Sequence, residues 1–188
     1  MEIKFEDIKK ANETINTTNI KGKEYAEVNQ RIKAFRMVYP NGSISTEMKS
    51  NENGVCIFNA VVGYQEGENF ILLGSGTAYE KENSSFINKT SYIENCETSA
   101  VGRALGMAGF GIDTSVASAE EVANAMTQQD SEKVIDKKMV ESLNKAIDNA
   151  KITDDVVELI LSQYGYTSTS EIKIKDYMNI VNDFKAKK

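Results

Sequence analysis

Apolar residues recur at helical spacing near the start of the chain. Phe5, Ile8 and Ile15 predict a first helix. The stretch "YAEVNQRIKAFRMVYP" has the same period and predicts a second helix, with Tyr25 at the start of its apolar face and Pro40 just beyond its end.

Three strand-like runs follow, "SISTEMKS" (43–50), "VCIFNAVVGYQ" (55–65) and "FILLGSGTAYEK" (70–81). The turn segments "NENG" and "QEGEN" separate them by lengths that suit hairpins. Consecutive strands joined by short loops predict an antiparallel meander, which needs a helix over its apolar face. We expect residues 91–111 to form that helix, and the fold class is therefore α+β, a three-stranded antiparallel β-meander packed by helices with a β-β-β-α core.

The pattern changes near residue 128. The stretch "SAEEVANAMT" (118–127) predicts a short helix capped by Ser118, with Glu121 at the capping-box position. Polar residues then predict a linker over 128–136, and renewed helical periodicity predicts a small all-α, three-helix module over 137–188. The larger N-terminal domain takes residues 1–127.

The helix over 91–111 is unusually rich in small residues. Gly102 and Gly106 lie four positions apart, and each glycine inside a helix costs about 1 kcal/mol relative to alanine. Ala100, Ala104 and Ala108 form a second small row with the same spacing. Close backbone approach is the expected compensation, and the sequence leaves open whether the neighbour lies in the same domain or in another subunit.

Composition limits the function classes. Of the 188 residues, 40% are hydrophobic, which suits a globular chain, and there is neither a membrane-length apolar run nor a secretory leader, so we expect a cytoplasmic protein. Cys56 and Cys96 lie far apart and are expected to be buried thiols. Histidine is absent, which removes the common catalytic triads and most zinc sites. Catalysis is therefore the less favoured interpretation, and we expect a protein that is not an enzyme and uses no metal or cofactor.

The charge balance does not favour long-range attraction to a polyanion. The net charge is -6, and residues 1–112 carry 12 basic and 14 acidic side chains. Nucleic-acid binding would therefore need a local basic groove, repeated in an assembly.

Several stretches of the N-terminal part resemble a known family. They are "YAEVNQRIKAF", "NGSISTE", "VCIFNAVVGY", "GSGTAYE" and, most specifically, "ENCETSAVGRALGMAGFGID". Together they resemble the single-strand annealing proteins of phages, of the ERF and Sak types, which are distantly similar to the eukaryotic recombination mediator usually called Rad-fifty-two. The resemblance covers roughly residues 1–127.

This resemblance implies an ATP-independent protein that forms rings or helical arcs, holds single-stranded DNA along a basic groove and anneals it to a complementary strand during phage recombination. It implies a place in the bacterial host cytoplasm and a contact between Arg103 and the DNA backbone. The C-terminal module resembles the variable tails of phage recombination proteins, with a phage or host single-strand-binding protein or an exonuclease as its expected partner.

Other basic residues are candidates for the same groove. Arg31, Lys33 and Arg36 cluster on the second predicted helix, and three more lysines flank strand ends, although a solvated surface charge is the simpler interpretation of each one taken singly. Arg103 has a structural alternative, pairing with Glu97 or Asp113. The expected DNA-binding residues are Arg103, Lys49, Lys81, Lys89, Arg31, Lys33 and Arg36, and the candidate base-stacking or core aromatics are Tyr64, Tyr79, Phe86 and Tyr92.

Two further motifs have competing interpretations. The stretch "GSGTAY" begins like a dinucleotide fingerprint but has Tyr79 at the third glycine position. Glu47 and Lys49 are spaced like the acid-x-lysine pair of metal-dependent nucleases, although alternating charges on an exposed strand explain them more simply. A nuclease and a non-catalytic protein-interaction module therefore remain the alternatives to DNA annealing.

Overall fold

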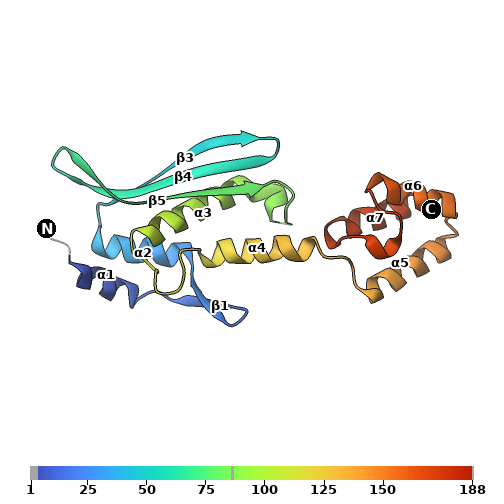
Figure 1. Ribbon diagram of the computed structural model, residues 1–188, viewed down its shortest axis with the longest axis horizontal. Coiled ribbons are helices and arrows are strands. Elements are labelled where there is room, and N and C mark those ends of the chain that lie inside the picture. Colours follow the sequence, from blue (N-terminus) through green and yellow to red (C-terminus); the bar gives the residue numbers. More distant parts are fainter. Residues whose placement is uncertain (1–3, 86, 188) are drawn as a thin grey trace. The chain divides into compact units, whose positions relative to one another are not determined.

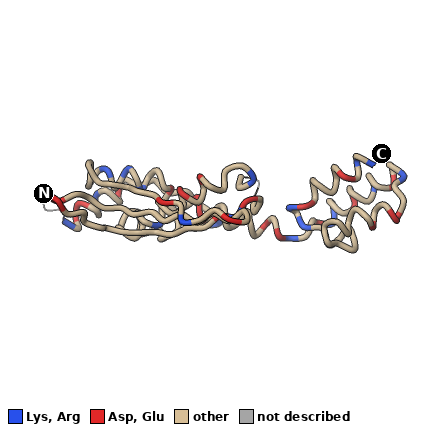
Figure 2. The backbone as a smooth tube through the Cα atoms, turned by 90° about the horizontal axis from the view of Figure 1, so that it is seen from above, with Lys and Arg blue, Asp and Glu red and all other residues tan. Residues whose placement is uncertain are grey.

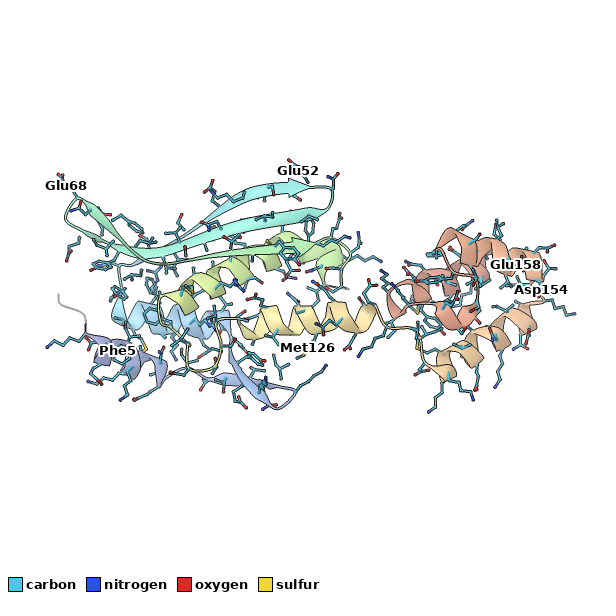
Figure 3. The ribbon with its side chains drawn as sticks, viewed as in Figure 1. Phe5, Glu52, Glu68, Met126, Asp154 and Glu158 are labelled. Atoms are coloured by element: carbon cyan, nitrogen blue, oxygen red, sulfur yellow. The ribbon has the colours of Figure 1, made fainter. Side chains whose placement is uncertain are left out.

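Three long antiparallel strands form the meander in the computed structural model, which describes residues 4–85 and 87–187 (Figure 1). They are β3 (Ser43–Glu52), β4 (Val55–Glu66) and β5 (Asn69–Lys81), in the spatial order β3-β4-β5. Figure 3 shows Glu52 and Glu68 at opposite ends of this sheet, beside the two hairpin turns. The predicted α+β class is confirmed.

Side chains alternate along the central strand from Val55 to Val62. Cys56, Phe58, Ala60 and Val62 are buried on one face of β4, and the residues between them are partly exposed on the other. The sheet therefore has one covered face and one outer face.

Helix α3 (Asn88–Met107) packs on the covered face, close to β5 (Figure 1). A Cβ atom placed on Gly74 or Gly76 would lie 2.5 Å from backbone atoms of Ala104. No side chain fits in that space, so the two glycines of β5 and the alanine row of α3 allow helix and sheet to meet almost backbone to backbone.

Helix α2 (Val28–Val38) packs on another side of α3, against its glycine row. A Cβ atom on Gly102 would lie 2.8 Å from Cγ2 of Val28, and one on Gly106 would lie 2.6 Å from Nη1 of Arg31. The expected close approach is therefore confirmed, and it occurs within the N-terminal unit.

A short hairpin precedes α2 and was not predicted. Helix α1 (Phe5–Asn12) is followed by β1 (Thr17–Ile20) and β2 (Lys23–Ala26), an antiparallel pair. Its two-residue turn has positive φ at both Lys21 and Gly22. The second predicted helix consequently begins at Val28, because the residues before it pair as a strand.

Helix α4 (Ala119–Ser131) begins where the sequence predicts and ends four residues later than expected. The backbone N–H of Glu121 donates to Oγ of Ser118 at 3.2 Å, which is the predicted cap. The first residues of the expected linker are thus helical.

Three helices and a short 3-10 turn form the C-terminal region. They are α5 (Lys137–Ala150), α6 (Asp154–Gln163), η1 (Thr169–Glu171) and α7 (Ile174–Ala186). Their core contains Leu143, Ile160, Ile172, Ile180 and Phe184 among others.

The chain divides into two compact units, Met1–Ala125 and Met126–Lys188, each with its own hydrophobic core. We call them the N-terminal unit and the C-terminal unit. No helix in the described ranges is long and apolar enough to cross a membrane.

The two cysteines are free and buried, as expected. The Cys96 thiol donates to the backbone carbonyl of Cys56 at 3.3 Å. Burial raises the pKa of Cys96 to about 12, so this thiol stays protonated and unreactive between β4 and α3.

Candidate nucleic-acid interface

Arg103 lies on α3 beside β5, in the most specific of the family-like motifs. A Cβ atom placed on Gly76 would lie 2.7 Å from the Cβ atom of Arg103. The side chain of Arg103 is 40% exposed. Nη1 donates to Oε1 of Glu121 at 2.8 Å. Within the described residues, Nε and Nη2 of Arg103 have no hydrogen-bond partner, so part of the guanidinium is available to a ligand.

The partner of Arg103 is neither of the carboxylates that the sequence suggested. Glu97 instead accepts a hydrogen bond from Oγ1 of Thr46 at 2.6 Å. Glu121 comes from the first turn of α4, and its side chain is 25% exposed. Its second oxygen, Oε2, is buried and lacks a hydrogen-bond partner among the described residues.

Arg31 is not on a binding surface, which corrects the prediction for this residue. It is fully buried, and its guanidinium donates to four backbone carbonyls at 2.5–3.1 Å. Those acceptors are Gly102 of α3 and Ser115, Val116 and Ala117 of the segment before α4. Burial lowers the pKa of Arg31, and the nearby carboxylates Glu120 and Glu121 oppose that shift. Arg31 therefore fastens the 115–117 segment to α3 and has no surface left for DNA.

The other two cations of α2 differ from Arg31. Arg36 is exposed but folds back, donating from Nη1 to the carbonyls of Gly42 and, at 3.5 Å, Pro40. Its guanidinium carbon also lies 5.5 Å from the centre of the Phe35 ring. Lys33 is exposed, and its ammonium pairs with none of the described residues.

Three lysines gather at one end of the sheet. Lys81 ends β5, and Lys49 occupies a bulge in β3 at the same end, since Ser50 pairs with Ile57 and Ile57 pairs with Tyr79. Lys89, in the first turn of α3, is brought near by a hydrogen bond from Nδ2 of the preceding Asn88 to Glu80. We call Lys49, Lys81, Lys89 and Tyr79 the sheet-end cluster.

The members of this cluster differ in whether their charged groups are already paired. Lys49 forms an exposed ion pair with Glu47, with Nζ and Oε2 at 2.5 Å, and exposed pairs of this kind contribute little. Lys81 and Lys89 are exposed and their ammonium groups pair with no residue in the described ranges. Tyr79 is 73% exposed on the outer face.

The other candidate aromatics have structural roles or lie outside the described ranges. Tyr64 stacks on Tyr39 with ring centres 5.2 Å apart, and the hydroxyl of Tyr92 donates to Asn51 at 3.1 Å. Phe86 lies outside the described residues. Tyr79 is therefore the candidate that is placed to stack on a base.

The outer face of the sheet beside Tyr79 carries polar side chains on either side of the partly exposed Ile57 and Val61 of β4. Nδ2 of Asn59 donates to Oγ1 of Thr77 at 3.1 Å across β4 and β5. Ser45 and Ser75 flank Val61 on the neighbouring strands. A surface of hydroxyl, amide and aliphatic side chains, with a tyrosine and lysines at one end, suits an extended polar chain.

Charge does not by itself mark a binding surface. Basic and acidic positions are interspersed along the N-terminal unit in Figure 2, and this unit carries 12 basic and 17 acidic side chains. A cavity of about 460 Å³ lined by α2, β3, α3 and the start of α4 contains two carboxylates, Glu97 and Glu120. That cavity would repel phosphate, so Arg103, beside the covered face of β5, and the sheet-end cluster, whose Tyr79 lies on the outer face, remain the better candidates.

The other two motifs have structural surroundings that differ from those of a nuclease site or a dinucleotide site. Glu47 and Lys49 bind each other, and the described residues include no group of three or more His, Cys, Asp or Glu able to hold a metal. The "GSGTAY" stretch lies inside β5, where Gly74 and Gly76 face the backbone of α3 rather than a phosphate.

The central part of the N-terminal unit is thus a helix, a three-stranded meander and a second helix. Residues 32–108, which run from α2 to the end of α3, match a family model described as Slr1353 N-terminal dsRNA-binding domain-like. The match spans about two fifths of the chain and includes Arg103, Lys33, Arg36 and the sheet-end cluster. Comparison with curated proteins and with solved structures found no match.

Proposed function

We propose that the N-terminal unit binds nucleic acid, and that its ligand is single-stranded DNA which the protein anneals to a complementary strand. The observation that carries this proposal is the match of the helix–meander–helix segment to a family described as dsRNA-binding domain-like. The resemblance of "ENCETSAVGRALGMAGFGID" to phage annealing proteins directs it toward single-stranded DNA.

The geometry around Arg103 supports a phosphate contact. Its guanidinium is partly exposed and keeps donors without a described partner, and arginine donates to phosphate oxygens through a rigid, permanently charged fork. Lys81 and Lys89 add two exposed ammonium groups, and Tyr79 offers a ring on which a base can stack.

The acidic balance of the N-terminal unit requires the contacts to be repeated. One copy offers few cations to DNA, so we propose a homo-oligomer in which neighbouring copies extend the phosphate track. Light scattering should then detect a species many times heavier than the 20.8 kDa chain. A strict monomer at micromolar concentration, with and without DNA, would contradict this part.

The chemistry requires neither a nucleotide nor a metal. Annealing makes no covalent bond, because the protein only has to hold one strand extended and accessible to its complement. We therefore propose a binding protein rather than an enzyme, acting in the phage-infected bacterial cytoplasm, with a partner recombination protein recruited by the C-terminal unit.

A competition experiment tests the ligand class. Fluorescence anisotropy with a labelled oligonucleotide, in EDTA, should give saturable binding that unlabelled single-stranded DNA of any sequence displaces. Arg103→Ala should weaken binding, whereas Lys145→Ala, an exposed lysine of the C-terminal unit, serves as the control and should not. Absence of binding, or equal affinities for wild type and Arg103→Ala, would overturn the proposed site.

Double-stranded RNA is the second candidate ligand, because the matched family is described by it. A helix, a meander and a helix can contact a duplex through its backbone and hydroxyl groups, largely without reading sequence. Unlabelled duplex RNA that competes better than single-stranded DNA would favour this candidate.

A further inference from the structure

Glu121 makes a contact that the proposed function does not yet use. Its carboxylate is three quarters buried, and its one hydrogen bond to a described residue is with Nη1 of Arg103. The residue is fixed in place from the other side, because its backbone N–H donates to the Ser118 cap of α4.

A phosphate could meet Arg103 either by displacing Glu121 or by joining it. Displacement would leave a mostly buried carboxylate without a hydrogen-bond donor, which is costly even with the charge of Arg31 nearby, because a buried acceptor that loses its donor does not regain its hydration. Joining is cheaper, because the guanidinium has five donors and Nε and Nη2 have no partner among the described residues. Joining would keep the carboxylate on Nη1 while phosphate binds the remaining donors.

We propose that Glu121 is a positioning residue for Arg103, holding the guanidinium by one nitrogen so that its other donors can meet a nucleic-acid phosphate. This rests on the proposed function, and it adds α4 to the binding site. An unheld arginine samples many rotamers and must be ordered at the moment of binding, which weakens the contact.

A positioning role and simple charge repulsion predict opposite changes in DNA affinity when Glu121 is removed. Removing an acid near a phosphate site should strengthen binding if that acid only repels DNA. We expect Glu121→Ala to weaken binding of single-stranded DNA about tenfold, as loss of a charge-assisted hydrogen bond does. Glu121→Gln keeps an oxygen acceptor for Nη1 without the negative charge, so it should bind within about twofold of wild type or more tightly.

Glu120→Ala is the matched control. Glu120 is in the same turn of α4 and carries the same charge, but it accepts from the backbone N–H of Val28 rather than from Arg103. Its removal should not weaken DNA binding. Circular dichroism melting of each variant separates loss of fold from loss of contact, and Glu121→Gln tests the proposal even if the alanine variant melts early.

Salt dependence gives the decisive readout. For both Arg103→Ala and Glu121→Ala, the slope of log affinity against log salt should fall in magnitude by about 0.7 per contact, and the double variant should lose no more than Arg103→Ala alone. Glu121→Ala binding as tightly as wild type, or losses that add fully in the double variant, would overturn the positioning role and leave the proposed function intact. If wild type binds no single-stranded DNA, both fail.

Discussion

Replacing Arg31 by methionine is expected to destabilise the N-terminal unit by an amount that follows from its contacts. The buried guanidinium donates to the carbonyls of Gly102, Ser115, Val116 and Ala117 at 2.5–3.1 Å. Methionine fills similar space but donates nothing, so these carbonyls lose their charged partner.

The magnitude is the difference between two large quantities. A hydrogen bond from a charged donor contributes about 1.5–3 kcal/mol, so four of them give roughly 6–12 kcal/mol. Burying the guanidinium costs several kcal/mol, which methionine recovers, and the lowered pKa of Arg31 has the same cause. We expect a net loss of about 3–5 kcal/mol, a large part of the total stability of a domain.

Urea unfolding followed by circular dichroism measures this loss. Lys33→Met is the matched control, since it makes the same substitution on an exposed residue of the same helix and should change stability by less than about 0.5 kcal/mol. Equal unfolding midpoints for the two variants would show that the carbonyl contacts of Arg31 contribute nothing net, and would refute the reasoning.

Three further outcomes follow from the packing and the charges. Gly76→Ala should cost about 2–3 kcal/mol in urea unfolding, because its Cβ would lie 2.5 Å from the Ala104 nitrogen, whereas exposed Ser75→Ala should be near neutral. Hydrogen bonds from Lys173 and Lys175 lower the pKa of Glu132 from 4.5 to about 2, so its stabilising effect on the C-terminal unit is present above pH 4.5 and is lost as pH falls toward 2. Glu132→Gln should therefore make the melting temperature less dependent on pH over that window. A pH profile of the melting temperature that is the same as that of wild type would contradict the ion pairs. A chain ending at Ser131 should remain folded by circular dichroism, because the N-terminal unit has its own core, and aggregation would contradict that independence.

The meander and the main helices were predictable because their patterns are local. Alternation along 55–65 and short polar turns suffice to define β4 and its neighbours. The hairpin of β1 and β2 was missed because its turn places Lys21 at positive φ, a position where Asn or Gly usually marks such turns. Its strands are short and mostly exposed, so they lack a clear apolar alternation.

The structural role of Arg31 could not be predicted because its hydrogen-bond acceptors lie far along the chain. Its position near Lys33 and Arg36 instead suggested a basic surface. Arg31 and Lys33 are two positions apart and so point about 200° away from each other on a helix. The spacing of Val28, Arg31, Phe35 and Val38 did contain the answer, because it places the arginine in the apolar stripe of α2. Its acceptors at 115–117 are backbone carbonyls, which every residue type has, so no sequence pattern distinguishes them.

The position of Arg103 beside β5 could be anticipated from its small neighbours, but its partner could not. Glu121 looked like a capping-box residue, and its backbone does bond to the Ser118 cap. Its side chain instead reaches Arg103, because the chain turns back after α3 and brings the first turn of α4 alongside it. The spacing of residues within one helix does not predict a contact between two helices that the chain brings together in this way.

The most direct test of the account is annealing of two complementary labelled oligonucleotides in EDTA, followed by fluorescence energy transfer. The account predicts that the wild-type protein accelerates duplex formation without nucleotide or metal, and that Arg103→Ala, folded and assembled like wild type, does so much more slowly. Wild-type protein that leaves the spontaneous annealing rate unchanged, or an Arg103→Ala variant that accelerates annealing as well as wild type, would contradict it.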